Sequence, residues 1–169
     1  ALSLTAQPGA RQTARAAETS LCYTGARYGD MFGEYARRLG LAHSTVALPE
    51  PGGALLAGDQ RVLDLSGRTD RRVAAARDAG DAALRRYVLR HARPEFIHIE
   101  QPFIGRTGLT AQVLTAHGYR PLLREGDGGD FVARSAVTAP QRLPGLRRWA
   151  EHAAQQARTH AAQAGPACA

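Results

Sequence analysis

Lysine is absent from this chain, and all 22 of its basic residues are arginine. They outnumber the 15 acidic residues, which leaves a formal net charge of +7. A basic surface attracts phosphate, nucleic acid or an anionic membrane face. The arginines are nevertheless scattered along the sequence and lack the interleaved aromatic residues of a nucleic-acid platform. We therefore expect a solvated basic surface and no specific nucleic-acid partner.

Long apolar runs and chemical signature motifs are also missing. No stretch of about 18 apolar residues occurs, so no segment is predicted to cross a membrane. Neither the glycine motifs of nucleotide-binding loops nor the serine context of a nucleophile elbow is present. We therefore predict no catalytic residue and no cofactor in this chain. Because it begins with Ala and has no leading signal peptide, we expect a mature or excised piece of a longer protein.

Cysteine occurs only twice, as Cys22 and Cys168. Almost the whole chain separates the two, and neither has the spacing of a metal-ligand motif. An oxidising compartment would allow them to pair, and two unpaired thiols are an equally good interpretation. No metal site is predicted.

The sequence does contain alternating strand and helix patterns. Helical patterns cover 10–39, 71–92 with a break near Gly80 and Asp81, and 109–117. Short buried strands are predicted at 44–48, 61–65 and 96–99, and a hairpin at 119–124 and 131–135. Helices between strands favour parallel pairing. We predict an α/β fold with a small, mostly parallel mixed sheet flanked by helices, and a C-terminal antiparallel hairpin.

The ends of the chain differ in composition from this α/β domain. We expect a linker over 1–9, the α/β domain over 10–137, and a proline-containing linker with an Ala-rich helix and tail over 138–169. That last helix, predicted at 146–162, has only Leu146 and Trp149 as large anchors. Whether it packs on the domain is left open.

Within 10–39, large apolar residues fall on one helical face. This stripe is predicted to be core, and the alternative is a surface that stacks on a ligand. Gly25, Gly29 and Gly33 interrupt the helix and would let a neighbouring element approach closely. The stripe consists of Leu21, Tyr28, Phe32, Tyr35 and Leu39.

The segment from Leu48 to Asp70 contains two strand ends, several glycines and four acidic residues. In a parallel sheet the carboxyl ends of the strands meet at one edge, where ligands usually bind. Gly52 and Gly53 could present backbone N–H groups to an anion there. Asp64 and Asp70 could place two carboxylates near a metal or a sugar hydroxyl, or could simply close a turn and cap a helix. The predicted binding residues are Glu50, Gly52, Gly53, Asp64, Gly67, Arg68, Asp70 and Glu100, with Gln101 beside them.

Two further pairs of polar residues are candidates for metal binding. His98 and Glu100 lie two apart in a strand and so share a face, as half of a metal site or as a structural pair. Asp127 and Asp130 fall in a Gly-rich turn between the hairpin strands, which indicates calcium only weakly because the ligand series of an EF-hand is missing.

An ordered series of short motifs resembles a known family. The motifs are Pro49-Glu50-Pro51-Gly52, Arg61-Val62-Leu63-Asp64-Leu65-Ser66-Gly67-Arg68-Thr69-Asp70, Arg93-Pro94-Glu95-Phe96-Ile97, Gly118-Tyr119 and Phe131-Val132-Ala133-Arg134. Over about 23–134 they are similar to the extracytoplasmic C-terminal domain of bacterial multi-span glycosyltransferases of the GT-C type, which use polyprenyl-phosphate sugars. Arg68 departs from the family, which generally has Leu at that position.

This resemblance implies that the catalytic carboxylate lies in a membrane-embedded region that the sequence does not contain. The chain is then expected to be a non-catalytic accessory domain at the extracytoplasmic face of the cytoplasmic membrane. Its partners would be a cell-envelope glycan acceptor and the membrane-embedded upstream region, and the parent protein would use the polyprenyl-phosphate sugar donor. The alternative is a free-standing α/β enzyme that processes sugars or nucleotides, in which Asp64, Asp70 and Glu100 bind substrate or metal.

Overall fold

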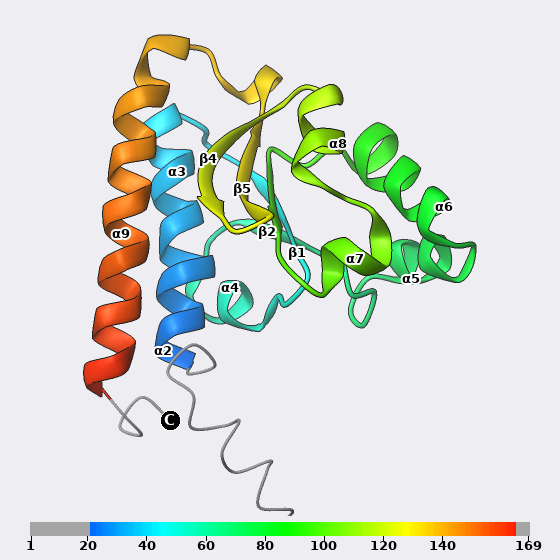
Figure 1. Cartoon of the computed structure of the whole chain (residues 1–169), viewed down its shortest axis with the longest axis horizontal. Helices are drawn as coiled ribbons and strands as arrows, with labels where there is room; N and C mark the ends of the chain where they lie inside the picture. The colour runs from blue at the N-terminus through cyan, green and yellow to red at the C-terminus, as the bar shows by residue number, and fades with distance from the viewer. Residues whose placement is uncertain (1–20, 165–169) are drawn as a thin grey trace, which may run out of the picture.

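The computed structural model describes residues 21–164 of the chain, and its centre is a five-stranded mixed sheet (Figure 1). The strand order is β2-β1-β3-β5-β4. The first three of these strands are parallel, and β5 and β4 run antiparallel as a hairpin at one edge. This arrangement confirms the predicted α/β fold. The strands are β1 (Thr45–Leu48), β2 (Arg61–Asp64), β3 (Phe96–Ile99), β4 (Tyr119–Glu125) and β5 (Gly128–Ala133).

Helices cover both faces of the sheet (Figure 1). One face carries a continuous helix made of α2 (Leu21–Thr24), the π-helical segment η2 (Gly25–Asp30) and α3 (Met31–Leu39), with α9 (Leu143–Ala164) beside it. The other face carries α5 (Arg71–Asp78), α6 (Asp81–Arg86), the π-helical segment η3 (Tyr87–Ala92), α7 (Phe103–Thr107) and α8 (Ala111–Ala116). The remaining short helices are α4 (Gly52–Ala57), η4 (Arg134–Ala136) and η5 (Pro140–Arg142).

Side chains alternate along each strand and so divide the core into two layers. Val46 and Phe96 point toward the layer that contains the α2–α3 helix, and Ala47 and Ile97 point toward the layer under α5–α8. His98 follows Ile97, so it faces the α2–α3 helix, where a buried histidine needs polar partners.

The C-terminal helix packs on the domain, which answers the question that the sequence left open. Leu143 and Leu146 are buried in the same core layer as α3, together with Ala150 and Ala154. The ring of Trp149 packs edge-on against Tyr35, with 5.5 Å between centroids. Residues at these spacings form one helical stripe, and small alanines let the α9 backbone lie close to its neighbours.

Two local details bear on the predicted elements. The break predicted near Gly80 and Asp81 lies where Gly80, with φ +99°, is the N-cap of α6 and Asp81 is its first residue. The helix α7 lies between the predicted strand at 96–99 and the predicted helix at 109–117, where no helix was predicted. Residues 1–20 and Cys168 lie outside the described residues, so the linker over 1–9, the first part of the 10–39 helix and the cysteine pairing remain predictions.

Candidate functional site at the carboxyl edge of the parallel strands

The carboxyl ends of β1, β2 and β3 border a cleft of about 140 Å³. The loops that follow these strands supply its polar side chains, and α5 and α7 supply two arginines. This is the edge at which a parallel sheet normally presents a ligand site. Of the predicted site residues, the cleft brings together Glu50, Arg68, Glu100 and Gln101. The arginines Arg77 and Arg106 complete its charged lining.

Positive charge exceeds negative charge in this cleft, since three arginines face two glutamates. Arg77 donates a hydrogen bond to the carbonyl of Ser66 and so holds the β2–α5 loop. The guanidinium groups of Arg68 and Arg106 make no hydrogen bond to any other residue in the described part of the chain. Their donors are therefore available to a ligand that carries oxygen acceptors.

Glu100 joins the cleft to a buried polar network behind it. Its carboxylate Oε2 lies 3.6 Å from Nε2 of His98 and 3.5 Å from the hydroxyl of Tyr28. The side chain of Glu100 remains 41 % exposed, whereas that of His98 is only 2 % exposed. Interaction with His98 lowers the pKa of Glu100, although partial burial opposes this effect. Glu100 thus presents an ionised carboxylate to the cleft.

The buried network is centred on Asp130, whose side chain is fully enclosed. Its Oδ1 accepts hydrogen bonds from Nδ1 of His98 at 2.8 Å and Nη2 of Arg27 at 2.9 Å. Its Oδ2 accepts from Nη1 of Arg27 and from the hydroxyl of Tyr35, both at 2.9 Å. Arg27 also reaches Glu125 at 2.6 Å. Four donors therefore satisfy one buried carboxylate, as a buried charge requires.

The charges of this network stabilise one another. Burial alone would raise the pKa of Asp130, but Arg27 and His98 outweigh it and hold that pKa at about 2. Burial likewise opposes the charge on Arg27 and on His98, yet the carboxylates of Asp130 and its neighbours raise the pKa of both. Because Asp130 is ionised, Nδ1 of His98 carries the proton in their hydrogen bond. Nε2 of His98 has no hydrogen-bond partner among the described residues and lies toward Glu100.

Arg27 and Tyr28 reach this network from the π-helical segment η2. Such segments often occur at functional sites, because they reorient side chains within a helix. The rings of Tyr28 and His98 lie 5.0 Å apart, which fixes the imidazole between the helix and β3. The predicted aromatic stripe is therefore core at Phe32 and Leu39, and its two tyrosines also contribute their hydroxyl groups to the network.

The prediction that Asp130 lies in the hairpin turn is wrong. The turn is formed by Gly126 and Asp127, and Asp130 belongs to β5, directly opposite His98 in β3. Gly128 is the first residue of β5, and only glycine fits there because a Cβ would lie 2.0 Å from the carbonyl oxygen of Ile99. The weak indication of a calcium site in this turn is therefore also wrong, because Asp130 binds Arg27. Within residues 21–164, no group of three or more metal-ligating residues occurs.

Asp64 and Asp70 serve the local backbone. Asp64 is buried, and its two oxygens accept hydrogen bonds from the backbone and hydroxyl groups of Ser66 and Thr69. These bonds lower its pKa against the opposing effect of burial. Asp70 is the N-cap of α5 and accepts from the backbone of Arg72 and Val73. Both residues follow the turn-and-cap interpretation, and neither lines the cleft.

Two of the three glycines in the predicted site have packing roles. A Cβ on Gly53 would lie 2.3 Å from the backbone of Thr24, so this glycine lets α4 lie directly against α2. Gly67 has φ +76° and sits against α5 at Ala74. Gly52 begins α4, and a Cβ there would meet no described residue within 4 Å outside its own helix and chain neighbours. The predicted anion-binding turn at Gly52 and Gly53 is therefore the first turn of a short helix.

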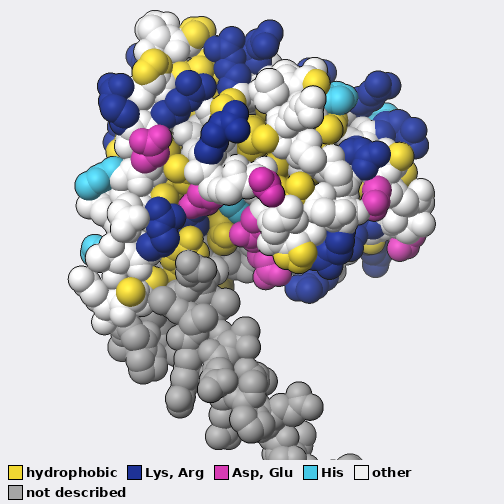
Figure 2. All heavy atoms as spheres, in the orientation of Figure 1, with side chains coloured by type: hydrophobic (Ala, Val, Ile, Leu, Met, Phe, Trp, Pro, Cys, Tyr) yellow, Lys and Arg dark blue, Asp and Glu magenta, His cyan; other side chains and the backbone are white. Residues whose placement is uncertain are grey.

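Basic side chains are spread over the face shown in Figure 2 rather than collected in one place. None of the helices within residues 21–164 has the length and hydrophobicity of a membrane-spanning segment. Comparison with known proteins found no matching family, no matching curated protein and no matching solved structure.

Proposed function

We propose that this chain is an accessory domain of a bacterial membrane glycosyltransferase and that it binds a cell-envelope glycan acceptor in the carboxyl-edge cleft. One observation carries the proposal. An ionised Glu100, supported by His98 and Tyr28, lies in the same cleft as Arg68 and Arg106, whose guanidinium groups are unoccupied by other described residues.

This combination suits a sugar. The carboxylate of Glu100 accepts hydrogen bonds from sugar hydroxyl groups, and the guanidinium groups of Arg68 and Arg106 donate to ring, hydroxyl or acidic oxygens. Because His98 and Tyr28 hold the side chain of Glu100 in place, that side chain loses less conformational entropy on binding than a flexible one would. At about 140 Å³ the cleft suits one end of a glycan rather than a long segment of it.

The wider context of the proposal comes from the motif series in the sequence. The domain would lie at the extracytoplasmic face, next to a membrane-embedded region of the same protein that holds the polyprenyl-phosphate sugar. In that arrangement the domain positions the acceptor and performs no sugar transfer itself. A reading frame that encodes several apolar runs of about 20 residues ahead of Ala1 would support this context.

NMR titration with cell-envelope glycan fragments tests the binding proposal. We expect chemical-shift changes at Glu50, Arg68 and Glu100, and a loss of affinity of about tenfold in Glu100→Gln. The matched control is Glu151→Gln, which changes an exposed glutamate on α9. Shifts that avoid the cleft, or equal affinity in the two variants, would rule out glycan binding at this site.

An enzyme remains the second candidate, because Nε2 of the buried His98 has no hydrogen-bond partner among residues 21–164 and lies 3.6 Å from Glu100. A histidine held at Nδ1 by a carboxylate is a common arrangement for general acid-base catalysis. Asp64 and Asp70 are engaged by the backbone, so Glu100 and His98 would perform the chemistry. Turnover of a sugar or nucleotide substrate by the purified chain, abolished in a folded Glu100→Gln variant, would favour this candidate over simple binding.

A further inference from the structure

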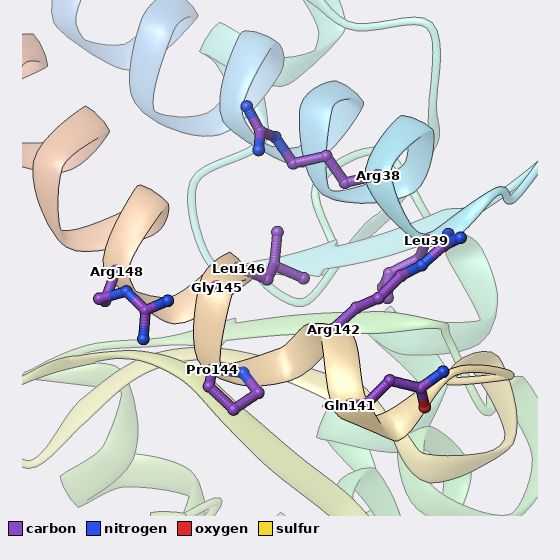
Figure 3. Close-up of a pocket in the computed structure, with 8 residues that line it drawn as sticks. All are labelled: Arg38, Leu39, Gln141, Arg142, Pro144, Gly145, Leu146 and Arg148. Carbon is purple, nitrogen blue, oxygen red and sulfur yellow. The ribbon is translucent and has the colours of Figure 1, made fainter.

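A second and larger cavity, of about 460 Å³, lies between the end of α3 and the start of α9 (Figure 3). Arg38 contributes from α3, Arg142 from η5 and Arg148 from α9. Leu146 and Pro144 provide apolar surface between them. Among the described residues that line this cavity, every charged side chain is an arginine, which distinguishes it from the mixed charges of the carboxyl-edge cleft.

The two cavities lie at opposite ends of the sheet. The chain leaves α3 at Leu39 and enters β1 at Thr45, so the arginine cavity is near the amino-terminal ends of the parallel strands. The first cleft borders the carboxyl ends of the same strands. A ligand in one cavity therefore does not occupy the other, and the arginine cavity is independent of the proposed glycan site.

The arginines of this cavity differ in how firmly they are held. Nε of Arg38 donates to Glu34 at 2.6 Å, and its guanidinium lies over the ring of Trp149, 4.6 Å from the centroid. Glu34 is shared with Arg37, so one carboxylate faces two guanidinium groups. Arg142 and Arg148 are exposed and make no side-chain hydrogen bond within the described part of the chain. The net charge around the cavity is therefore positive, and two guanidinium groups are free to bind.

We propose that this cavity binds a phosphoryl group. A guanidinium donates two parallel hydrogen bonds to phosphate oxygens, and its charge persists at any physiological pH. The phosphoryl group would bind to the guanidinium groups of Arg142 and Arg148, which both line the cavity, with Arg38 as a fixed positive neighbour. The apolar surface of Leu146 and Pro144 accommodates the carbon atoms next to the phosphate ester. A phospholipid headgroup and a free phosphorylated small molecule share this chemistry.

Two measurements distinguish a free phosphorylated molecule from a phospholipid headgroup as the ligand. NMR titration with glycerol 3-phosphate reports binding of a free phosphomonoester, with expected shifts at Arg142, Leu146 and Arg148. Co-sedimentation with phosphatidylglycerol vesicles, compared with phosphatidylcholine vesicles, reports binding of an anionic headgroup. Binding in the first assay assigns the cavity to free phosphates, and binding in the second alone assigns it to lipid headgroups. Absence of binding in both overturns the proposal.

The double variant R142A/R148A tests the residues, and R86A/R90A is its control. The control removes the same number of charges from another basic depression, on α6 and η3. We expect R142A/R148A to weaken binding by about tenfold or more and the control to change it by less than about twofold. A third variant, R142K/R148K, keeps the charge and loses the paired donors, so its affinity should be intermediate. Equal losses in R142A/R148A and the control would show attraction by net charge alone and overturn the proposal.

Discussion

His98 and Asp130 lie directly opposite each other in β3 and β5, with 2.8 Å between Nδ1 and Oδ1 and almost no exposure of either side chain. The pair links the hairpin to the parallel strands and, through Arg27 and Tyr35, links the sheet to the α2–α3 helix. On its other side, His98 supports the carboxylate of Glu100 at the cleft. The stability of the domain and the geometry of its candidate site therefore depend on the same buried charges.

Replacement of Asp130 by Asn should destabilise the domain strongly. The variant leaves the buried Arg27 and His98 without their carboxylate, and removing one member of a buried ion pair typically costs about 3–5 kcal/mol. Urea denaturation of the variant and the parent chain measures the change. Asp127→Asn, which alters an exposed aspartate of the neighbouring turn, should stay within about 0.5 kcal/mol. Similar losses in the two variants would argue against a central role for Asp130.

The stability of the domain should fall as pH rises through the neutral range. In the folded state, burial and the positive charge of Arg27 oppose protonation of His98, but the carboxylates of Asp130 and Glu100 outweigh them. The pKa of His98 therefore lies above its usual value of about 6.5, and the ring of Tyr28 packs beside the imidazole. A raised pKa means that this contribution is complete below about pH 6 and is lost as pH passes the folded value. Asp130, with a pKa of about 2, loses its own contribution only in acid, as pH falls below about 4.

Denaturation curves recorded from about pH 5 to pH 9 check this expectation. The variant His98→Gln keeps a polar side chain and removes the titrating group, so its stability should vary less over the neutral range. An NMR titration of the His98 imidazole provides an independent readout. A titration midpoint below that of an unfolded peptide would contradict the expected direction.

Replacement of Gly53 by Ala should destabilise the domain by about 1–3 kcal/mol. The new methyl group would lie 2.3 Å from the backbone of Thr24, so α4 would have to move away from α2. Gly52→Ala is the matched control, because a Cβ at that position would meet no atom of a described residue within 4 Å apart from its chain neighbours and its own helix. The control should be neutral or slightly stabilising, by up to about 1 kcal/mol, through its effect on the unfolded chain. Thermal denaturation of both variants measures the two changes in stability, and equal changes would contradict the close contact at Gly53.

Asp70→Ala separates the structural role of this residue from a role in ligand binding. Loss of the N-cap of α5 should lower the free energy of unfolding by about 1 kcal/mol. Because Asp70 does not line the carboxyl-edge cleft, glycan affinity at a temperature well below unfolding should be unchanged. Asp78→Ala, at the other end of the same helix, is the control for charge removal. A loss of glycan affinity in Asp70→Ala but not in Asp78→Ala would show that Asp70 takes part in binding.

The sequence determined those features that depend on neighbouring residues. Alternating and apolar runs predict the strands because residues on one face of a strand are two apart. Asp70 reads as a cap and Asp64 as a turn residue because their hydrogen bonds reach only two to five residues ahead. Even the cleft that contains Glu50, Arg68 and Glu100 follows from the sequence, since the rule for parallel sheets places strand ends at one edge.

Only the tertiary structure decided which distant side chains meet. Arg27 and Asp130 are 103 residues apart, and no local pattern distinguishes a buried arginine on a helix from an exposed one. Asp130 follows two glycines, which indicate a turn until the register of β5 against β3 places it opposite His98. The packing of α9 is equally nonlocal, because its alanines become core residues only where α3 and the sheet already lie beside them. Long-range pairing and close packing, which no short segment encodes, therefore assembled both the buried network and the arginine cavity.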